Sequence, residues 1–151
     1  MAVQLAKAKG ARVIATASAV NIGLVTRLGV DQFIDYTKTR FEDAAKDVDV
    51  VLDTVGGDTQ EQSWQVLKPG GILVSVVSPP SEAAATAHKA RGAFVFIRPS
   101  GEQLTAIAQL IDQGRIKPLI HTVLSLTEVR QAHAISQGGH ARGKIVLQIA
   151  D

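Results

Sequence analysis

Short apolar runs alternate with amphipathic or Ala-rich segments along the sequence, and this alternation is the feature that most restricts the fold. The runs predict strands over residues 12–16, 32–35, 48–53, 72–77, 93–97, 119–126 and 144–149. The segments between them predict helices before Gly10 and over 21–28, 41–46, 58–67, 82–89, 101–113 and 128–137. Strands that alternate with helices at spacings of about 15 to 25 residues form parallel βαβ crossovers. The sequence therefore predicts an α/β fold with a doubly wound, mainly parallel sheet.

Start and stop residues mark several of these helices. Gly10 is expected to end the first helix in the left-handed conformation that glycine tolerates. Asp58 with Glu61 and Ser100 with Gln103 have the spacing of capping boxes, and Thr127 is the expected N-cap of the helix over 128–137.

Composition excludes several classes of protein. The 151 residues contain no cysteine, so a disulfide scaffold, a thiolate zinc site and a cysteine nucleophile are excluded. The net charge is only +2 and the basic residues are scattered, which argues against a nucleic-acid partner. No apolar run reaches the roughly 18 residues of a membrane span, and no secretory signal is recognisable. We therefore expect a cytoplasmic chain without a membrane partner.

The four histidines do not form a metal-binding pattern. They are widely separated, with no His-x-x-x-His pair and no carboxylate at ligand spacing. The sequence therefore predicts no zinc site.

In a doubly wound fold the ligand binds at the carboxyl ends of the strands. This rule directs attention to four turns that follow predicted strands, at residues 17–21, 36–39, 54–59 and 77–80.

Motifs at and around these turns resemble those of a known superfamily. Segments 2–16 and 28–36 are similar to the coenzyme half of the medium-chain dehydrogenase/reductases. Four further segments resemble motifs of the zinc-free, quinone-oxidoreductase-like branch of this superfamily. They are DVVLDTVGGD (49–58), LKPGGILVS (67–75), RPSGEQL (98–104) and HARGKIVL (140–147). The resemblance covers essentially the whole chain and implies a Rossmann-like sheet.

The resemblance also implies that the nucleotide-binding fold is incomplete. In this family a catalytic domain, a first strand and a Gly-rich phosphate-binding turn precede the helix with which this sequence begins. We therefore expect residues 1–117 to form a Rossmann-like domain truncated at its N-terminus, without that strand and turn. Residues 118–151 are expected to be a segment that packs on the catalytic domain in relatives. A missing central strand leaves its neighbours unpaired, so we expect the sheet to close the gap or to borrow a strand from another copy.

Two residues are candidates for the adenosine end of a dinucleotide. No acid occurs between Gly10 and Asp31, whereas NAD-preferring sites place an acid after the second strand to bind the ribose 2′-OH. The neutral turn with Ser18 favours NADP, and the resemblance implies that Tyr36 lines the adenosine phosphate site. The alternatives are a Ser18 that only starts the next helix and a Tyr36 that is a half-buried strand-end residue.

Further residues are implied by the resemblance for the nicotinamide end and the phosphates. They are Thr54, Val55, Gly56, Val76, Val77, Ser78, Phe96, Arg98 and Lys144. The alternatives are a glycine turn before a helix, buried strand residues, a core Phe96, a solvated Arg98 and an edge-strand Lys144. The resemblance implies that Arg142, in the same motif as Lys144, could also reach a cofactor phosphate. For Arg142 we favour the alternative of a solvated edge-strand charge.

The resemblance implies the coenzyme-binding portion of an NADP(H)-dependent oxidoreductase that transfers hydride to a quinone or an α,β-unsaturated carbonyl compound. We expect no catalytic residue in this half and no activity of the isolated chain, because substrate contacts come largely from the catalytic domain. The alternatives are a non-catalytic oligomerisation or regulatory module and a truncated product without a function.

We also expect a homodimer through residues 93–97, which are apolar on both faces and lack the charges that protect exposed edges.

Overall fold

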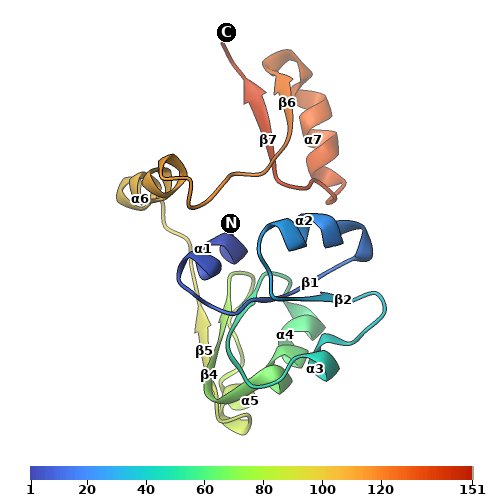
Figure 1. The fold of residues 1–151 in the computed structure, drawn as a ribbon, viewed down its shortest axis with the longest axis vertical. Helices are drawn as coiled ribbons and strands as arrows, with labels where there is room; N and C mark the ends of the chain where they lie inside the picture. Colours follow the sequence, from blue (N-terminus) through green and yellow to red (C-terminus); the bar gives the residue numbers. More distant parts are fainter. Residues whose placement is uncertain (151) are drawn as a thin grey trace.

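The computed structural model describes residues 1–150 as an α/β chain whose strands all pair in parallel (Figure 1). The strands are β1 (Ile14–Ala17), β2 (Gln32–Asp35), β3 (Val48–Asp53), β4 (Leu67–Ser75), β5 (Arg91–Phe94), β6 (Ile120–Ser125) and β7 (Lys144–Gln148). The helices are α1 (Ala2–Ala8), α2 (Ile22–Arg27), α3 (Phe41–Ala44), α4 (Gly57–Ser63), α5 (Glu82–Ala87), α6 (Gly101–Asp112) and α7 (Val129–Gln137). The predicted fold class is confirmed. None of these helices is long and apolar enough to cross a membrane.

Only β2 and β3 have the predicted limits, and two of the other strands differ at residues of the candidate site. The run over 72–77 belongs to β4, which begins at Leu67 and ends at Ser75, so Val76 and Val77 lie in the following turn. The run over 93–97 overlaps β5, which ends at Phe94. An apolar run indicates which side chains are expected to be buried. The limits of a strand depend instead on where the neighbouring strand supplies backbone hydrogen-bond partners.

The helix caps differ in part from the predicted ones. Gly10 ends α1 as expected, with φ +79°, and Ser100 caps α6 by accepting the Gln103 amide at 3.2 Å. Asp58 does not cap α4, which begins after Gly56 without a side-chain cap. Ser125, not Thr127, forms the capping box with Glu128 at the start of the turn that leads into α7.

The first five strands lie in two sheets that are not joined by hydrogen bonds. β1 pairs with β2, and β3, β4 and β5 form a second sheet in that order. A Rossmann fold has the strand order 3-2-1-4-5-6, and the observed order matches it with position 1 open between β1 and β3. The expected direct closure of this gap is therefore wrong for residues 1–150, and Val50 and Leu52 of β3 remain 57% and 48% exposed.

Side-chain packing connects the two sheets. Ile34, Ala45 and Val66 form a buried cluster against which Ile14 of β1 and Val48 and Val51 of β3 pack. The burial of these side chains holds β1 and β3 on either side of the open position, with no ladder between them. A second cluster, Trp64, Leu73 and Ala85, lies under β4 and α5.

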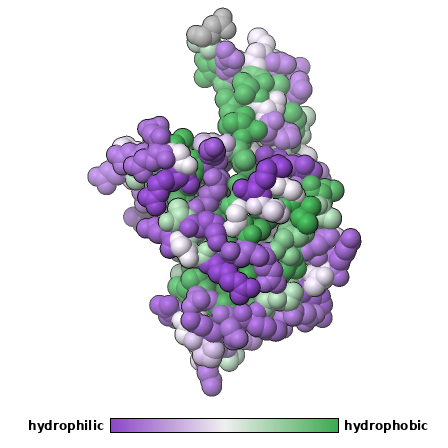
Figure 2. All heavy atoms as spheres, viewed as in Figure 1, coloured by the Kyte–Doolittle hydropathy of each residue, from purple (hydrophilic) through white to green (hydrophobic). Residues whose placement is uncertain are grey.

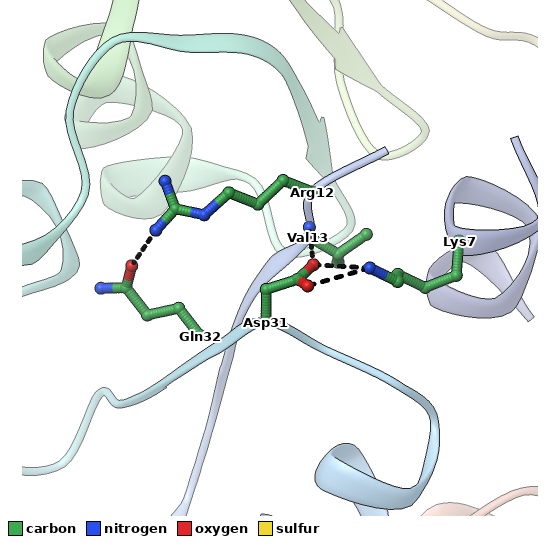
Figure 3. A network of polar contacts seen from close by, with 5 residues as sticks. All are labelled: Lys7, Arg12, Val13, Asp31 and Gln32. Atoms are coloured by element: carbon green, nitrogen blue, oxygen red, sulfur yellow. Dashed lines mark hydrogen bonds and ion pairs between the residues drawn. The ribbon is translucent and has the colours of Figure 1, made fainter. Parts of the chain in front are cut away.

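An ion pair anchors α1 to the first sheet (Figure 3). Lys7 Nζ lies 3.0 and 2.8 Å from the two carboxylate oxygens of Asp31, which also accepts the Val13 backbone amide at 2.7 Å. The hydrogen bond from Lys7, followed by that from Val13, lowers the pKa of Asp31. Figure 3 also shows Arg12 donating to Gln32, so the chain before β1 is tied to the first residue of β2.

The last elements form a sheet of their own. β6 pairs only with β7 among the described strands, and Figure 1 places both, with α7, at one end of the molecule. Figure 2 shows apolar side chains gathered on this unit, and Ile120, Val123 and Val146 are among its exposed residues. This separate sheet supports a boundary near residue 118, which stays a prediction.

Candidate functional site

A cavity of about 550 Å³ lies where β1 and β2 end. Ser18 follows β1, Tyr36 follows β2, and both line it. The opposite wall comes from the far end of the sequence, with Leu119 and the loop 139–143. The structure therefore brings the two predicted adenosine-end residues together with the HARGK motif.

The Ser18 hydroxyl is prepared to donate a hydrogen bond. Asn21 Nδ2 donates to Ser18 Oγ at 3.2 Å, which uses a lone pair of the hydroxyl and leaves its proton free. Asn21 lines the same cavity. Ser18 is also the N-cap residue of the 3₁₀ turn Ala19–Asn21, which it starts through its carbonyl, the acceptor of the Asn21 amide at 2.9 Å, and not through a side-chain cap, so the alternative of a helix-starting serine stays open.

Among residues 1–150 no acidic side chain lines this cavity. Asp35, at the end of β2, accepts the Thr37 hydroxyl at 2.7 Å and the Thr37 amide at 3.1 Å. The Thr37 hydroxyl is the main reason that the pKa of Asp35 is lowered, and the Ala19 backbone, next to Ser18, also lowers this pKa. A phosphate in the cavity would thus meet donors and a cation, with no carboxylate in its walls.

Of the two cationic residues in the HARGK motif, Arg142 borders this cavity and Lys144 does not. Arg142 lines the cavity, and its backbone amide donates to His121 Nδ1 at 3.3 Å. Gly143 has φ +126°, and a Cβ there would collide with the Leu119 carbonyl, so glycine is required where the loop meets the start of β6. Lys144 instead lines a separate hollow of about 470 Å³ between α7 and β7. The sequence reasoning set Arg142 aside because nothing local shows which basic residue of the motif turns towards Ser18.

A second group of predicted residues lies at the carboxyl ends of β3 and β4. Gly56 has φ +78°, and a Cβ there would be 3.0 Å from Val77 Cγ1 and 3.7 Å from Ser78 Oγ. The turn that contains Thr54 and Val55 therefore packs closely against the turn that contains Val76, Val77 and Ser78. Val55, Val76 and Val77 are exposed on the outer side of these turns, so Val76 and Val77 are not the buried strand residues of the alternative interpretation.

The sequence reasoning missed the buried polar residues beneath these turns. Asp53, Gln60 and Ser75 are all buried. Burial opposes ionisation of Asp53, but hydrogen bonds from Gly56, Val55, Gln60 and Ser75 outweigh it and lower its pKa. The sequence did contain one indication of this network, because Asp53 ends an apolar strand and stands shortly before the Gly56-Gly57 turn.

Phe96 and Arg98 lie beyond the end of β5 and are exposed. Phe96 is 76% exposed, so the alternative of a core phenylalanine is wrong. No recorded hydrogen bond or ion pair connects Arg98 with either group of residues, and Arg98 is solvated as its alternative stated.

Within residues 1–150 no three His, Cys, Asp or Glu side chains lie together in a group that could hold a metal ion.

Comparisons with known proteins identify the family of this chain. A family profile described as zinc-binding dehydrogenase matches residues 28–147. The chain is 30% identical to an NAD(P)H oxidoreductase, RTN4IP1, mitochondrial, of Danio rerio, over 99% of this chain and 46% of that protein. It is 32% identical to an NADPH-dependent alkenal/one oxidoreductase, chloroplastic, of Arabidopsis thaliana, over 97% of this chain and 36% of that protein.

A solved quinone oxidoreductase from Coxiella burnetii has the same fold, with a TM-score of 0.88 and 33% identity over 99% of this chain and 48% of that one. The chain thus spans less than half the length of the relatives it matches. Its parallel α/β fold, the family profile and these relatives agree with one another. The chain belongs to the zinc-binding dehydrogenase family of the medium-chain dehydrogenase/reductase superfamily and corresponds to its coenzyme-binding part.

Proposed function

We propose that this chain is the coenzyme-binding portion of an NADP(H)-dependent oxidoreductase that transfers hydride to a quinone or an α,β-unsaturated carbonyl compound. The observation that carries the proposal is the cavity that Ser18, Tyr36 and Arg142 line together and that no acidic side chain of residues 1–150 lines. The names of the relatives, an NADPH-dependent alkenal/one oxidoreductase and a quinone oxidoreductase, support the substrate class.

The cavity would hold the 2′-phosphate of the adenosine ribose. Ser18 donates its free hydroxyl proton to a phosphate oxygen, and the planar guanidinium of Arg142 offers paired donors that suit phosphate geometry. Tyr36 supplies an exposed ring edge and a phenol at the same wall. A carboxylate in these walls would repel the phosphate, and its absence from them permits NADP.

The turns after β3 and β4 would receive the nicotinamide end. Bound coenzyme supplies the hydride, and the protein's part is to bind, orient and shield the ring. Thr54, Val55 and Gly56 offer backbone and small side chains, and Val76, Val77 and Ser78 face the same edge of the sheet. Phe96, Arg98 and Lys144 stay proposed contacts, and no residue of this chain is assigned a catalytic role.

The alternatives are a non-catalytic oligomerisation or regulatory module and a truncated product without a function. Reading the coding DNA upstream of the Met1 codon discriminates between them and the proposal. An in-frame extension that encodes a strand and a Gly-rich turn favours the oxidoreductase, and a stop codon or frameshift favours the alternatives.

We propose a cytoplasmic location, although the two curated relatives described above are named as mitochondrial and chloroplastic. A fluorescent fusion of the full gene product tests that location.

The preference for NADPH over NADH is the direct test. NMR titration of this chain reads dissociation constants into the millimolar range and follows the amides of the Ser18 and Tyr36 turns. We expect shifts at these turns with NADPH at lower concentration than with NADH. Tighter binding of NADH would overturn the assignment of the phosphate cavity.

A further inference from the structure

Asp53 and Ser75 lie side by side at the ends of neighbouring strands. They are register partners in the β3–β4 ladder, and both are buried, with 3% and 0% of their surface exposed. Ser75 Oγ donates to Asp53 Oδ2 at 2.8 Å. The two side chains therefore form a buried hydrogen bond, here called the polar joint, between the last residues of two parallel strands.

Four backbone amides from two turns converge on this joint. Val55 and Gly56 donate to Asp53 Oδ1 at 3.0 and 2.8 Å. Val77 and Ser78 donate to Ser75 Oγ at 3.1 and 3.3 Å. A hydroxyl has one proton and two lone pairs, so Ser75 uses its proton on the carboxylate and both lone pairs on the second turn. The orientation of that hydroxyl, and with it the second turn, depends on an ionised Asp53.

Gln60 adds a third connection between the turns. Its Nε2 lies 2.9 Å from Asp53 Oδ2 and 3.1 Å from the Ser78 carbonyl oxygen, and it donates to both. Gly56 leaves no room for a side chain against Val77, so the turns touch directly. With their amides directed inward, the turns present Val55, Val76 and Val77 outward as one apolar surface.

We infer that Asp53 is a positioning residue which, through Ser75 and Gln60, locks the turns 54–57 and 76–78 into a single surface for the nicotinamide half of the coenzyme. This inference rests on the proposed function. The surface stands at the carboxyl edge of a parallel sheet, where doubly wound folds bind their ligands, and its exposed valines suit a flat ring. It is separate from the Ser18 cavity, because no residue of this network lines that cavity.

The test compares the whole coenzyme with its adenosine half. In Asp53→Asn the amide Nδ2 faces the donors on Ser75 and Gln60 in place of an acceptor, so the Ser75 hydroxyl can no longer hold both amides. We expect the dissociation constant for NADPH to rise about tenfold, the loss of one charge-assisted hydrogen bond, while that for 2′,5′-ADP stays at the wild-type value. Asp31→Asn is the matched control, because Asp31 also accepts a backbone amide but lies at the amino end of β2. It should leave both constants unchanged.

Amide hydrogen exchange of the free protein gives a second readout. Asp53→Asn should speed the exchange of the Val77 and Ser78 amides, which donate to Ser75 and not to Asp53 itself. Unchanged exchange at Val77 and Ser78 would overturn the coupling. Ser75→Ala removes the hydroxyl and keeps the carboxylate, and it provides the same comparison if Asp53→Asn does not fold.

The outcomes separate this inference from the proposed function. Equal losses of NADPH and 2′,5′-ADP affinity in Asp53→Asn would overturn the inference and leave the proposed function standing. A wild-type chain that does not bind 2′,5′-ADP at millimolar concentration would overturn the proposed function, and the inference with it, because this ligand has no pyrophosphate and does not need the Gly-rich turn.

Discussion

At Ser18 one hydroxyl proton is expected to decide how well a 2′-phosphate binds. Asn21 occupies a lone pair of Ser18 Oγ, so the proton is available to the cavity. Ser18→Ala should raise the dissociation constant for 2′,5′-ADP about tenfold, since a hydrogen bond to a charged group is worth roughly 1.5–3 kcal/mol. Ser100→Ala removes a capping hydroxyl remote from the cavity lining and should not change that constant. An unchanged constant in Ser18→Ala would remove Ser18 from the site.

Asp53 also makes stability depend on pH. Its pKa is lower in the folded chain than in the unfolded chain, where an aspartate titrates near about 3.9. The unfolded state therefore binds more protons in this range, so the contribution of Asp53 is present above about pH 4 and is lost as the pH falls through its folded pKa.

Asp53→Asn should lower the free energy of unfolding at pH 7 by about 1–3 kcal/mol, because buried donors lose their acceptor. Its stability should also fall less steeply than that of the wild type between about pH 5 and pH 2. Urea unfolding at a series of pH values measures both effects. Parallel pH profiles for the two proteins would show that Asp53 keeps its ordinary pKa when folded.

The end of β5 is the part of the sheet at which we expect a second copy of the chain to bind. Phe94, Val95, Phe96 and Ile97 are all exposed, and only the first belongs to the strand. The Val95 amide continues the ladder by donating to the Ser75 carbonyl at 2.9 Å, which leaves an apolar edge without protective charge.

We propose that two copies pair along this edge. Light scattering at micromolar concentration should give the mass of a dimer or a larger assembly, and Val95→Lys should reduce it to the monomer mass. Leu104→Lys places the same charge at an exposed position of α6 and should leave the assembly intact. A wild-type mass equal to the monomer would contradict the proposal.

For the whole molecule, the division of the sheet predicts that the chain alone is inactive. β1 and β3 each keep an edge without a strand partner among residues 1–150, and no Gly-rich phosphate turn stands before α1 in this sequence. The pyrophosphate would lose several charge-assisted hydrogen bonds, each worth roughly 1.5–3 kcal/mol, which moves a micromolar site to millimolar or weaker.

We therefore expect no NADPH oxidation when this chain is mixed with a simple quinone. The quinone oxidoreductase from Coxiella burnetii, of which this chain matches 48%, is the positive control. Comparable turnover per chain would show that the coenzyme and substrate are held by the residues present here.

The sequence alone determined the fold class and the edge of the sheet that carries the candidate site. The limits of β2 and β3 match the predicted runs 32–35 and 48–53, because periodicity and turn residues are local properties of the chain. Ser18, Tyr36, Thr54 and Gly56 could be named in advance because parallel strands present their carboxyl ends at one edge.

Only the tertiary structure decided which distant side chains meet there. Arg142 lies at the Ser18 cavity because the loop 139–143 packs against the start of β6, more than a hundred residues from Ser18 along the chain. Asp53 and Ser75 became a pair because the β3–β4 register places them opposite each other. Local pattern fixes neither register nor loop packing, since both depend on crossovers and on burial that involves the whole chain.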